Sequence, residues 1–313
     1  MKPVVIAHRG ASGYLPEHTR PAKVLAHVMG ADFLEQDVVA TRDDALLVLH
    51  DIHLDTVTDV TSHFPDRHRD DGRFYARDFD LEEIRSLTAW ERMNLDGSAV
   101  YPDRFPPRTG SNVIHTFAEE MELINRLNRA TGRNVGIYPE IKRPAWHKAE
   151  GVDIAPLLLE QINEFDGSDD KALVYVQCFD NSELARLREE LGCPWRLVQL
   201  IGENSWGEAE SDFEHLRSTE GLEQLSHIVD GIGPWIPHLY EFDGETLLST
   251  GLVQQAHQLS LSVHPFTFRQ DALPPGFATF EDLVRYCVSE LSVDGLFTDF
   301  TDTVVDILQD LKT

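Results

Sequence analysis

Cysteine, lysine and long apolar runs are all scarce in this sequence. Its 313 residues include three cysteines, an odd and sparse number that argues against a disulfide framework. No apolar run approaches the about 20 residues that a membrane-spanning helix needs. The run Val4–Ala7 follows directly on Lys2 and Pro3 and is typical of a buried strand, not of a secretory leader. The sequence as written therefore predicts a cytoplasmic protein, or a periplasmic one if a leader has been removed.

Positive charge is also in short supply. Lys and Arg number 27 against 54 Asp and Glu, so the formal net charge is −27. No run of Lys or Arg interrupts this acidic balance. Nucleic acid and anionic lipid would be repelled by such a chain, which argues against nucleic-acid partners and against stable membrane association. An anionic substrate would need a few local cations or a metal ion to hold it. The oligomeric state stays open.

Short apolar runs alternate along the chain with amphipathic stretches. Runs of this kind are typical of parallel strands that are covered on both faces. Pro21 and Gly30 delimit one expected helix, and Thr116 and Glu119 form the capping box of another. The alternation predicts an α/β fold, a (β/α)8 TIM barrel, with a doubly wound sheet as the alternative. The expected strands are Val4–Ala7, Phe33–Val39, Val135–Ile141, Leu173–Phe179, Leu197–Ile201, Ile228–Ile232, Leu261–Phe266 and Gly295–Phe300.

Two features depart from a plain barrel. A turn at 41–45 leads into a returning strand over Leu46–Leu49, which predicts a hairpin on the second barrel strand. The segment 52–112 then separates this hairpin from the next helix, far longer than the usual strand-to-helix loop of a few residues. We interpret it as an inserted cap, with one helix over Leu81–Arg92, inside a single domain that spans 1–313.

Carboxylates stand where neighbouring barrel strands are expected to end, which is where barrel enzymes carry their active sites. Glu35 and Asp37 are two residues apart and so point to the same side of a strand, and Glu140 and Lys142 repeat this spacing on the next strand. Three converging carboxylates repel one another unless a cation lies among them. All-oxygen ligands suit Mg²⁺, Ca²⁺ or Mn²⁺. The alternative is a set of ion pairs, Glu35 with Arg9 and Glu140 with Lys142, without a metal.

Two histidines, His8 and His50, each end an apolar strand and precede a turn. Histidine can accept one proton and donate another near neutral pH, as the cleavage of an ester requires. Arg9 and Lys142 supply positive charge that a phosphate group could use, unless they only neutralise the carboxylates. The same strand ends carry Gln177 and several aromatic residues.

These residues belong to an ordered set of motifs. The motifs are Ala7-His8-Arg9-Gly10-Ala11, Pro16-Glu17, Glu35-Gln36-Asp37-Val38, Leu49-His50-Asp51, Tyr138-Pro139-Glu140-Ile141-Lys142, Val174-Tyr175-Val176-Gln177-Cys178-Phe179-Asp180, Val263-His264-Pro265 and Gly295-Leu296-Phe297-Thr298-Asp299. In this order they resemble bacterial glycerophosphodiester phosphodiesterases, and more closely those of the periplasmic type. The resemblance covers essentially the whole chain.

The resemblance implies a barrel enzyme that hydrolyses glycerophosphodiesters to an alcohol and sn-glycerol 3-phosphate. His8 and His50 match the family's acid–base pair, and Arg9 and Lys142 match its phosphate contacts. Glu35, Asp37 and Glu140 match its ligands for one divalent cation, Ca²⁺ or Mg²⁺. The segment 52–112 matches its insertion. His18 stands where the wider family often has Asn, and a hydrogen-bonding role in its loop is the preferred interpretation.

Further substrate contacts are expected from side chains near the barrel mouth. Gln177 is one of them. The aromatic residues Phe179, Trp235, Phe266 and Trp146 are expected to form the pocket for the leaving alcohol, although each could instead pack in the core, and for Trp146 packing is the preferred interpretation. Which histidine acts first stays open, as does attack by water against attack by the neighbouring glycerol hydroxyl. Competing interpretations are a lysophospholipase D or sphingomyelinase D-like phosphodiesterase, a non-catalytic binding protein on the same fold, and a metal-dependent barrel aldolase or isomerase.

Overall fold

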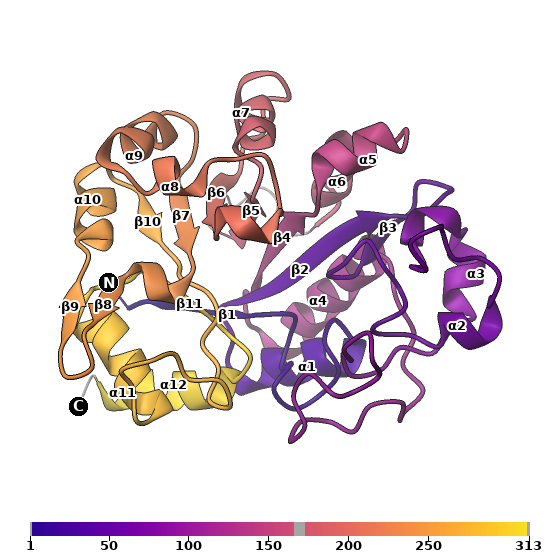
Figure 1. Cartoon of the computed structure of the whole chain (residues 1–313), viewed down its shortest axis with the longest axis horizontal. Helices are drawn as coiled ribbons and strands as arrows, with labels where there is room; N and C mark the ends of the chain where they lie inside the picture. The colour runs from indigo at the N-terminus through magenta and orange to yellow at the C-terminus, as the bar shows by residue number, and fades with distance from the viewer. Residues whose placement is uncertain (1, 166–172, 312–313) are drawn as a thin grey trace.

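The computed structural model describes residues 2–165 and 173–311 and shows a barrel of parallel strands with helices around it (Figure 1). The barrel strands are β1 (Val4–Ala7), β2 (Phe33–Ala40), β4 (Gly136–Ile141), β5 (Tyr175–Cys178), β6 (Arg196–Ile201), β7 (Gly231–Pro234), β10 (Ser262–Val263) and β11 (Gly295–Thr298). They pair in the order β10-β7-β6-β5-β4-β2-β1-β11. The circle closes between β10 and β11, because Asp294 N donates to Val263 O at 2.9 Å and Phe268 N to Phe297 O at 2.8 Å. The predicted TIM barrel is confirmed.

Two predicted strands differ most from those observed. The run Ile228–Ile232 was expected to be a strand, but Ile228 N and Val229 N both donate to Leu225 O and so continue the end of the preceding helix. The strand β7 therefore starts at Gly231. The run Leu261–Phe266 contributes only the two residues of β10 to the regular sheet.

Helices follow most strands, and the helix that contains Pro21 and the helix with the capping box of Thr116 and Glu119 begin as predicted. Thr19 caps the helix that contains Pro21, and Gly30 ends it with a left-handed φ of 107°. Thr116 and Glu119 form the expected capping box. The helices around the barrel are α1 (Arg20–Met29), α4 (Phe117–Thr131), α5 (Pro144–Ala149), α6 (Ile154–Ile162), α7 (Asn181–Glu189), α8 (Phe213–Leu216), α9 (Thr219–Ser226), α10 (Leu252–Gln258), α11 (Phe280–Arg285), η5 (Tyr286–Glu290) and α12 (Thr301–Asp310), with short turns η3 (Asn204–Trp206) and η4 (Ile236–His238) and a small hairpin of β8 (Tyr240–Phe242) and β9 (Leu247–Ser249).

The segment between the hairpin and α4 lies beyond β2, on the side of the molecule away from the chain termini (Figure 1). The hairpin itself is confirmed, since β3 (Leu46–Val48) pairs antiparallel with β2. The segment contains α2 (Val60–His63), η1 (Ala76–Asp78) and α3 (Leu81–Arg85). Its apolar side chains form a cluster with residues of the hairpin, namely Val39, Leu47, Leu49, Ile52, Leu54, Val57, Val60, Phe74, Ala76, Phe79, Ile84, Leu87, Ala89 and Ile114.

The predicted helix Leu81–Arg92 is wrong beyond Arg85. Ala89 N donates to Asn112 O at 2.7 Å, and Trp90 N donates to Val57 O at 2.9 Å. These pairings with distant backbone replace the hydrogen bonds that a longer helix would need. Among all the helices of the described residues, none is both long enough and apolar enough to span a membrane.

The barrel interior is built in layers that follow the two-residue period of the strands. Phe33, Tyr138 and Tyr175 fill it near the strand starts, and the rings of Tyr138 and Tyr175 stack with centroids 4.7 Å apart. Two residues further along the same strands, the inward side chains are Glu35, Glu140 and Gln177. The polar layer therefore rests on an aromatic one.

Candidate active site

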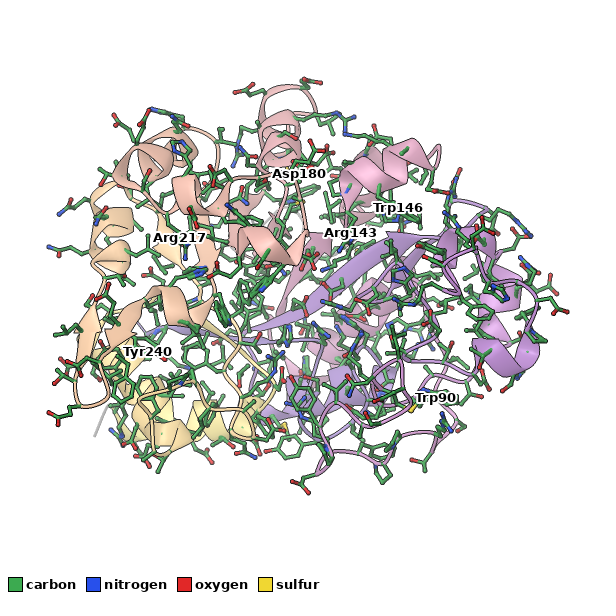
Figure 2. The ribbon with its side chains drawn as sticks, in the orientation of Figure 1. Trp90, Arg143, Trp146, Asp180, Arg217 and Tyr240 are labelled. Carbon is green, nitrogen blue, oxygen red and sulfur yellow. The ribbon has the colours of Figure 1, made fainter. Side chains whose placement is uncertain are left out.

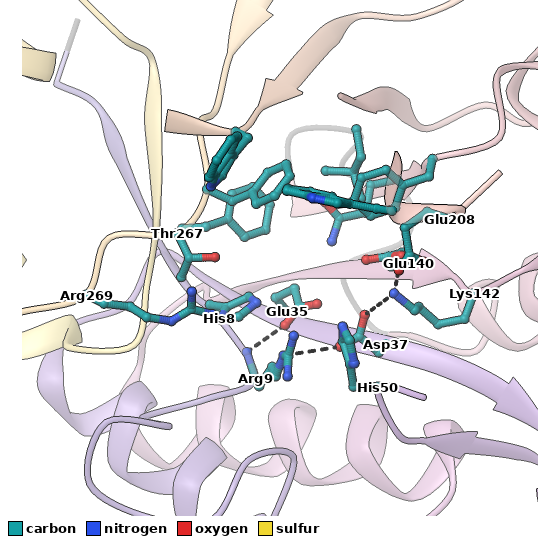
Figure 3. A pocket seen from close by; sticks show the side chains of 17 residues that line it. His8, Arg9, Glu35, Asp37, His50, Glu140, Lys142, Glu208, Thr267 and Arg269 are labelled. Atoms are coloured by element: carbon teal, nitrogen blue, oxygen red, sulfur yellow. Dashed lines mark hydrogen bonds and ion pairs between the residues drawn. The ribbon is translucent and has the colours of Figure 1, made fainter. Parts of the chain in front are cut away.

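A cavity of about 340 Å³ opens at the ends of the barrel strands (Figure 3). Apart from Trp146, it brings together the site residues that the sequence predicts: His8, Arg9, Glu35, Asp37, His50, Glu140, Lys142, Gln177, Phe179, Trp235 and Phe266. Charged side chains gather along one side of it in Figure 3. The aromatic wall includes two edge-on ring pairs, Trp206 with Trp235 at 5.2 Å and Phe179 with Phe266 at 5.9 Å between centroids.

His8 follows the end of β1 and is oriented by a carboxylate. Its Nδ1 lies 2.6 Å from Asp299 Oδ1, while Arg104 and Arg269 donate to Asp299 Oδ2 at 2.8 and 2.7 Å. Burial would raise the pKa of Asp299, but Arg269, His8 and Arg104 hold it well below its usual value. An ionised carboxylate only accepts hydrogen bonds, so Nδ1 of His8 carries the proton and Nε2 is free to accept one.

His50 follows the end of β3 and repeats this arrangement. Its Nδ1 lies 2.6 Å from Asp51 Oδ1, and Arg92 Nη1 donates to Asp51 Oδ2. Burial and the charge of Arg9 lower the pKa of both histidines, that of His8 to about 4 and that of His50 to about 3. Both imidazoles are therefore neutral at pH 7, and each is held in one orientation by its carboxylate.

The carboxylates on β2 point inward beside Arg9. Glu35 Oε2 accepts from Arg9 N at 2.6 Å, and Asp37 Oδ2 accepts from His18 Nε2 at 2.7 Å. His18 thus has the hydrogen-bonding role that its loop position suggests. Burial and the charge of Asp37 raise the pKa of Glu35 well above its usual value. Burial would raise the pKa of Asp37 too, but the neighbouring His50 and Lys142 hold it well below its usual value.

Glu140 and Lys142 form the second carboxylate group of the cavity. Lys142 Nζ lies 2.8 Å from Glu140 Oε1 and 3.8 Å from Asp37 Oδ1. Burial raises the pKa of Glu140 to about 8 against the opposing charge of Lys142. In the described part of the chain, His18, Glu35 and Asp37 bring potential ligand atoms within 4.8 Å of one another, whereas Glu140 lies outside this group.

The model of the glycerophosphoryl diester phosphodiesterase family matches residues 8–303. The chain belongs to that family. A glycerophosphodiester phosphodiesterase of Haemophilus influenzae is 40% identical over 99% of this chain and 90% of the relative, and one of Treponema pallidum is 34% identical over 97% and 91%. An Oleispira antarctica phosphodiesterase, solved with the product sn-glycerol-3-phosphate, shares the fold with a TM-score of 0.66, 19% identity and coverage of 98% and 97%. The predicted glycerophosphodiester phosphodiesterase family is therefore confirmed.

Several residues that line the cavity were not predicted from the sequence of this phosphodiesterase family member. They are Leu200, Trp206, Glu208, Thr267, Arg269 and Phe297. Trp206 and Glu208 lie in the loop after β6, which Arg143 holds by donating to Gly207 O at 3.0 Å. Arg269 follows the irregular end of the β10 segment, and its one sequence signal is that it lies close behind Phe266.

Trp146 does not line the cavity, in keeping with the packing interpretation. It lies on α5 near the insertion (Figure 2) and stacks on Tyr75, with ring centroids 5.7 Å apart and planes at 19°. The guanidinium of Arg69 lies between 4 and 6 Å from both rings. Trp146 therefore joins α5 to the insertion through its contacts with Tyr75 and Arg69.

Proposed function

We propose that this protein hydrolyses glycerophosphodiesters, such as glycerophosphocholine and glycerophosphoethanolamine, to an alcohol and sn-glycerol 3-phosphate. The observation that carries the proposal is the matched pair of histidines, His8 with Asp299 and His50 with Asp51, in one cavity with Arg9 and three carboxylates. The family match and the product named for the Oleispira antarctica structure support this substrate class.

The carboxylates of the cavity fit a divalent cation, Ca²⁺ or Mg²⁺. Asp37 Oδ1 is buried, and among the described residues none donates a hydrogen bond to it. Glu35 and Glu140, the other two proposed ligands, have raised pKa values because burial disfavours their charge, a cost that a bound cation would remove. Carboxylate oxygens are ligands that both ions accept. Such an ion supplies positive charge that offsets the charge developing on the phosphate.

The two histidines provide the proton transfers. One accepts the proton of the nucleophile through Nε2, while the other protonates the oxygen of the departing alcohol as its bond to phosphorus breaks. Both begin neutral, so the second takes up its proton after the substrate anion has bound, because nearby negative charge favours the imidazolium. Arg9 and Lys142 bind the phosphate oxygens and stabilise their negative charge.

The nucleophile is either water or the glycerol hydroxyl next to the phosphate. Attack by the hydroxyl releases the alcohol and leaves a five-membered cyclic phosphate, which water then opens to the monoester. Phosphorus NMR under single-turnover conditions distinguishes the routes. A transient cyclic phosphate supports internal attack, whereas oxygen from labelled water in the first product without that intermediate supports direct hydrolysis.

A coupled assay for glycerol 3-phosphate tests the function. We expect wild-type protein to release it from glycerophosphocholine, EDTA to abolish the release, and His50→Ala to lower kcat by about 10³-fold or more. The control is His68→Ala, which removes an exposed histidine of the insertion and leaves the rate unchanged. Full activity in EDTA would contradict the metal site. A failure of the wild type on every glycerophosphodiester, with Ca²⁺ or Mg²⁺ added, would contradict the function.

A further inference from the structure

A second cavity of about 190 Å³, which we call the cap compartment, adjoins the first. His8, Arg9, His50 and Arg269 line both cavities. The other residues of the cap compartment come from the loop after β1, the insertion and the end of β11, namely Ser12, Glu17, Glu91, Arg92, Val100, Tyr101, Arg104 and Asp299. A phosphodiester held between the two histidines would therefore lie at the junction of two cavities. Each cavity has room for one of its two ester-linked groups, which we call its arms.

The cap compartment has a mostly polar lining and no counterpart of the aromatic wall that forms one side of the larger cavity. Val100 is the one aliphatic side chain among its described lining residues. Its arginines are already bound within the protein, since Arg92 Nε donates to Glu17 at 2.9 Å and Arg104 Nη2 to Asp299 at 2.8 Å. Four guanidinium groups in the lining disfavour a cationic ligand such as an ammonium group. A neutral ligand rich in hydroxyl groups is a better match.

Glu91, from the insertion, brings a buried carboxyl group to the lining of the cap compartment. Only 3% of it is exposed, and its Oε2 accepts no hydrogen bond from the described residues. Burial raises the pKa of this carboxyl to about 8, with a further contribution from Glu17. Buried polar groups in folded proteins are almost always hydrogen-bonded to protein, water or ligand. An uncharged carboxyl can both accept from a hydroxyl group and donate to one.

We propose that the cap compartment binds the glycerol arm of the substrate and that Glu91 hydrogen-bonds the terminal hydroxyl of that arm. The inference rests on the proposed function, because it assigns the two halves of a glycerophosphodiester to two cavities. Glycerol is the arm that all these substrates share, and it suits the smaller, polar compartment. The variable alcohol then faces the larger cavity, where Phe179, Trp235 and Phe266 offer an apolar wall that sets few hydrogen-bonding demands.

The test pairs a change in the protein with the matching change in the substrate. The substrates are glycerophosphocholine and the phosphocholine ester of propane-1,2-diol, which lacks only the terminal hydroxyl. For wild-type protein we expect the missing hydroxyl to lower kcat/KM about tenfold. For Glu91→Leu we expect the same loss on glycerophosphocholine and no further loss on the analogue. Glu91→Gln keeps an acceptor and recovers part of the activity. The control Glu82→Gln changes an exposed carboxylate of the insertion and behaves as wild type.

The outcomes separate this inference from the function on which it rests. Equal losses for Glu91→Leu on both substrates, or no loss on either, would overturn the assignment while hydrolysis by the wild type upholds the function. No hydrolysis by the wild type would overturn both. Calorimetric binding of glycerol 3-phosphate against propane-1,2-diol 1-phosphate gives the same comparison without turnover, and the thermal unfolding of each variant shows that it is folded. Equal affinities of the wild-type protein for these two phosphates would also overturn the assignment.

Discussion

In the proposed mechanism Asp299 acts through His8, because its Oδ1 accepts a hydrogen bond from His8 Nδ1 at 2.6 Å. In Asp299→Asn the new amide can donate to Nδ1 and would hold the imidazole in the opposite tautomer, with the proton on Nε2. We expect kcat to fall by about 10³-fold or more, since the same change in a serine protease triad lowers kcat about 10⁴-fold, and KM to stay within about twofold. Steady-state kinetics on glycerophosphocholine measures both constants.

Asp271→Asn is the matched control for this positioning residue. Asp271 Oδ2 accepts from Arg104 Nε at 2.7 Å, and Arg104 also donates to Asp299. The control therefore removes an ion pair of the same arginine and leaves the contact with His8 in place, so kcat should remain near that of the wild type. Equal losses in the two variants would show that Asp299 acts through Arg104 and not through the tautomer of His8.

At the scale of elements, the strands were predictable where burial on both faces makes the run apolar. Every residue of β2 is buried, and the expected range differs from the observed one by a single residue. The ends of the strands were informative because a barrel gathers them at one mouth. Glu35 and Glu140 could therefore be placed together from spacing alone. Glu91 and Arg269 could not be placed from the sequence, because they lie in irregular backbone. The path of such backbone is set by hydrogen bonds with distant residues, such as the bond from Ala89 N to Asn112 O.

Lys23 joins α1 to α4 and β2 in the layer behind the site. Its Nζ lies 2.9 Å from Glu120 Oε1 and also donates to the backbone oxygen of Glu35, and both side chains of the ion pair are fully buried. Lys23→Met would leave the charge of Glu120 without its partner. We expect the free energy of unfolding at pH 7 to fall by about 3–5 kcal/mol, measured by chemical denaturation.

The double variant Lys23→Met/Glu120→Gln is the control, since it removes both charges and should recover most of that loss. Burial would raise the pKa of Glu120, but Lys23 and His115 hold it at about 2. Its contribution to stability is therefore present above the unfolded value of about 4.3 and is lost as the pH falls towards 2. The double variant should lack this part of the acid dependence. A single variant as stable as the wild type would contradict the role of the pair.

At the scale of the whole molecule, the net charge of −27 means that any divalent cation is attracted to the surface, so a specific site must be separated from general screening. A cation that binds only the folded protein at about 100 times its Kd stabilises it by about 2.7 kcal/mol. For a chain of this size that corresponds to a rise in Tm of about 4 °C. We expect this rise when Ca²⁺ or Mg²⁺ is added to EDTA-treated protein, measured by calorimetry.

Screening and site binding differ in what abolishes them. NaCl at the same ionic strength reproduces the screening part, because screening depends on ionic strength and not on coordination. Asp37→Asn removes one of the 54 acidic residues and so leaves the overall field nearly unchanged, but it replaces a proposed ligand. The rise in Tm that exceeds the NaCl effect should therefore vanish in this variant. If Asp37→Asn keeps the full cation-specific rise, the ion binds elsewhere on the acidic surface, and the carboxylates of the cavity are held by Arg9 and Lys142 alone.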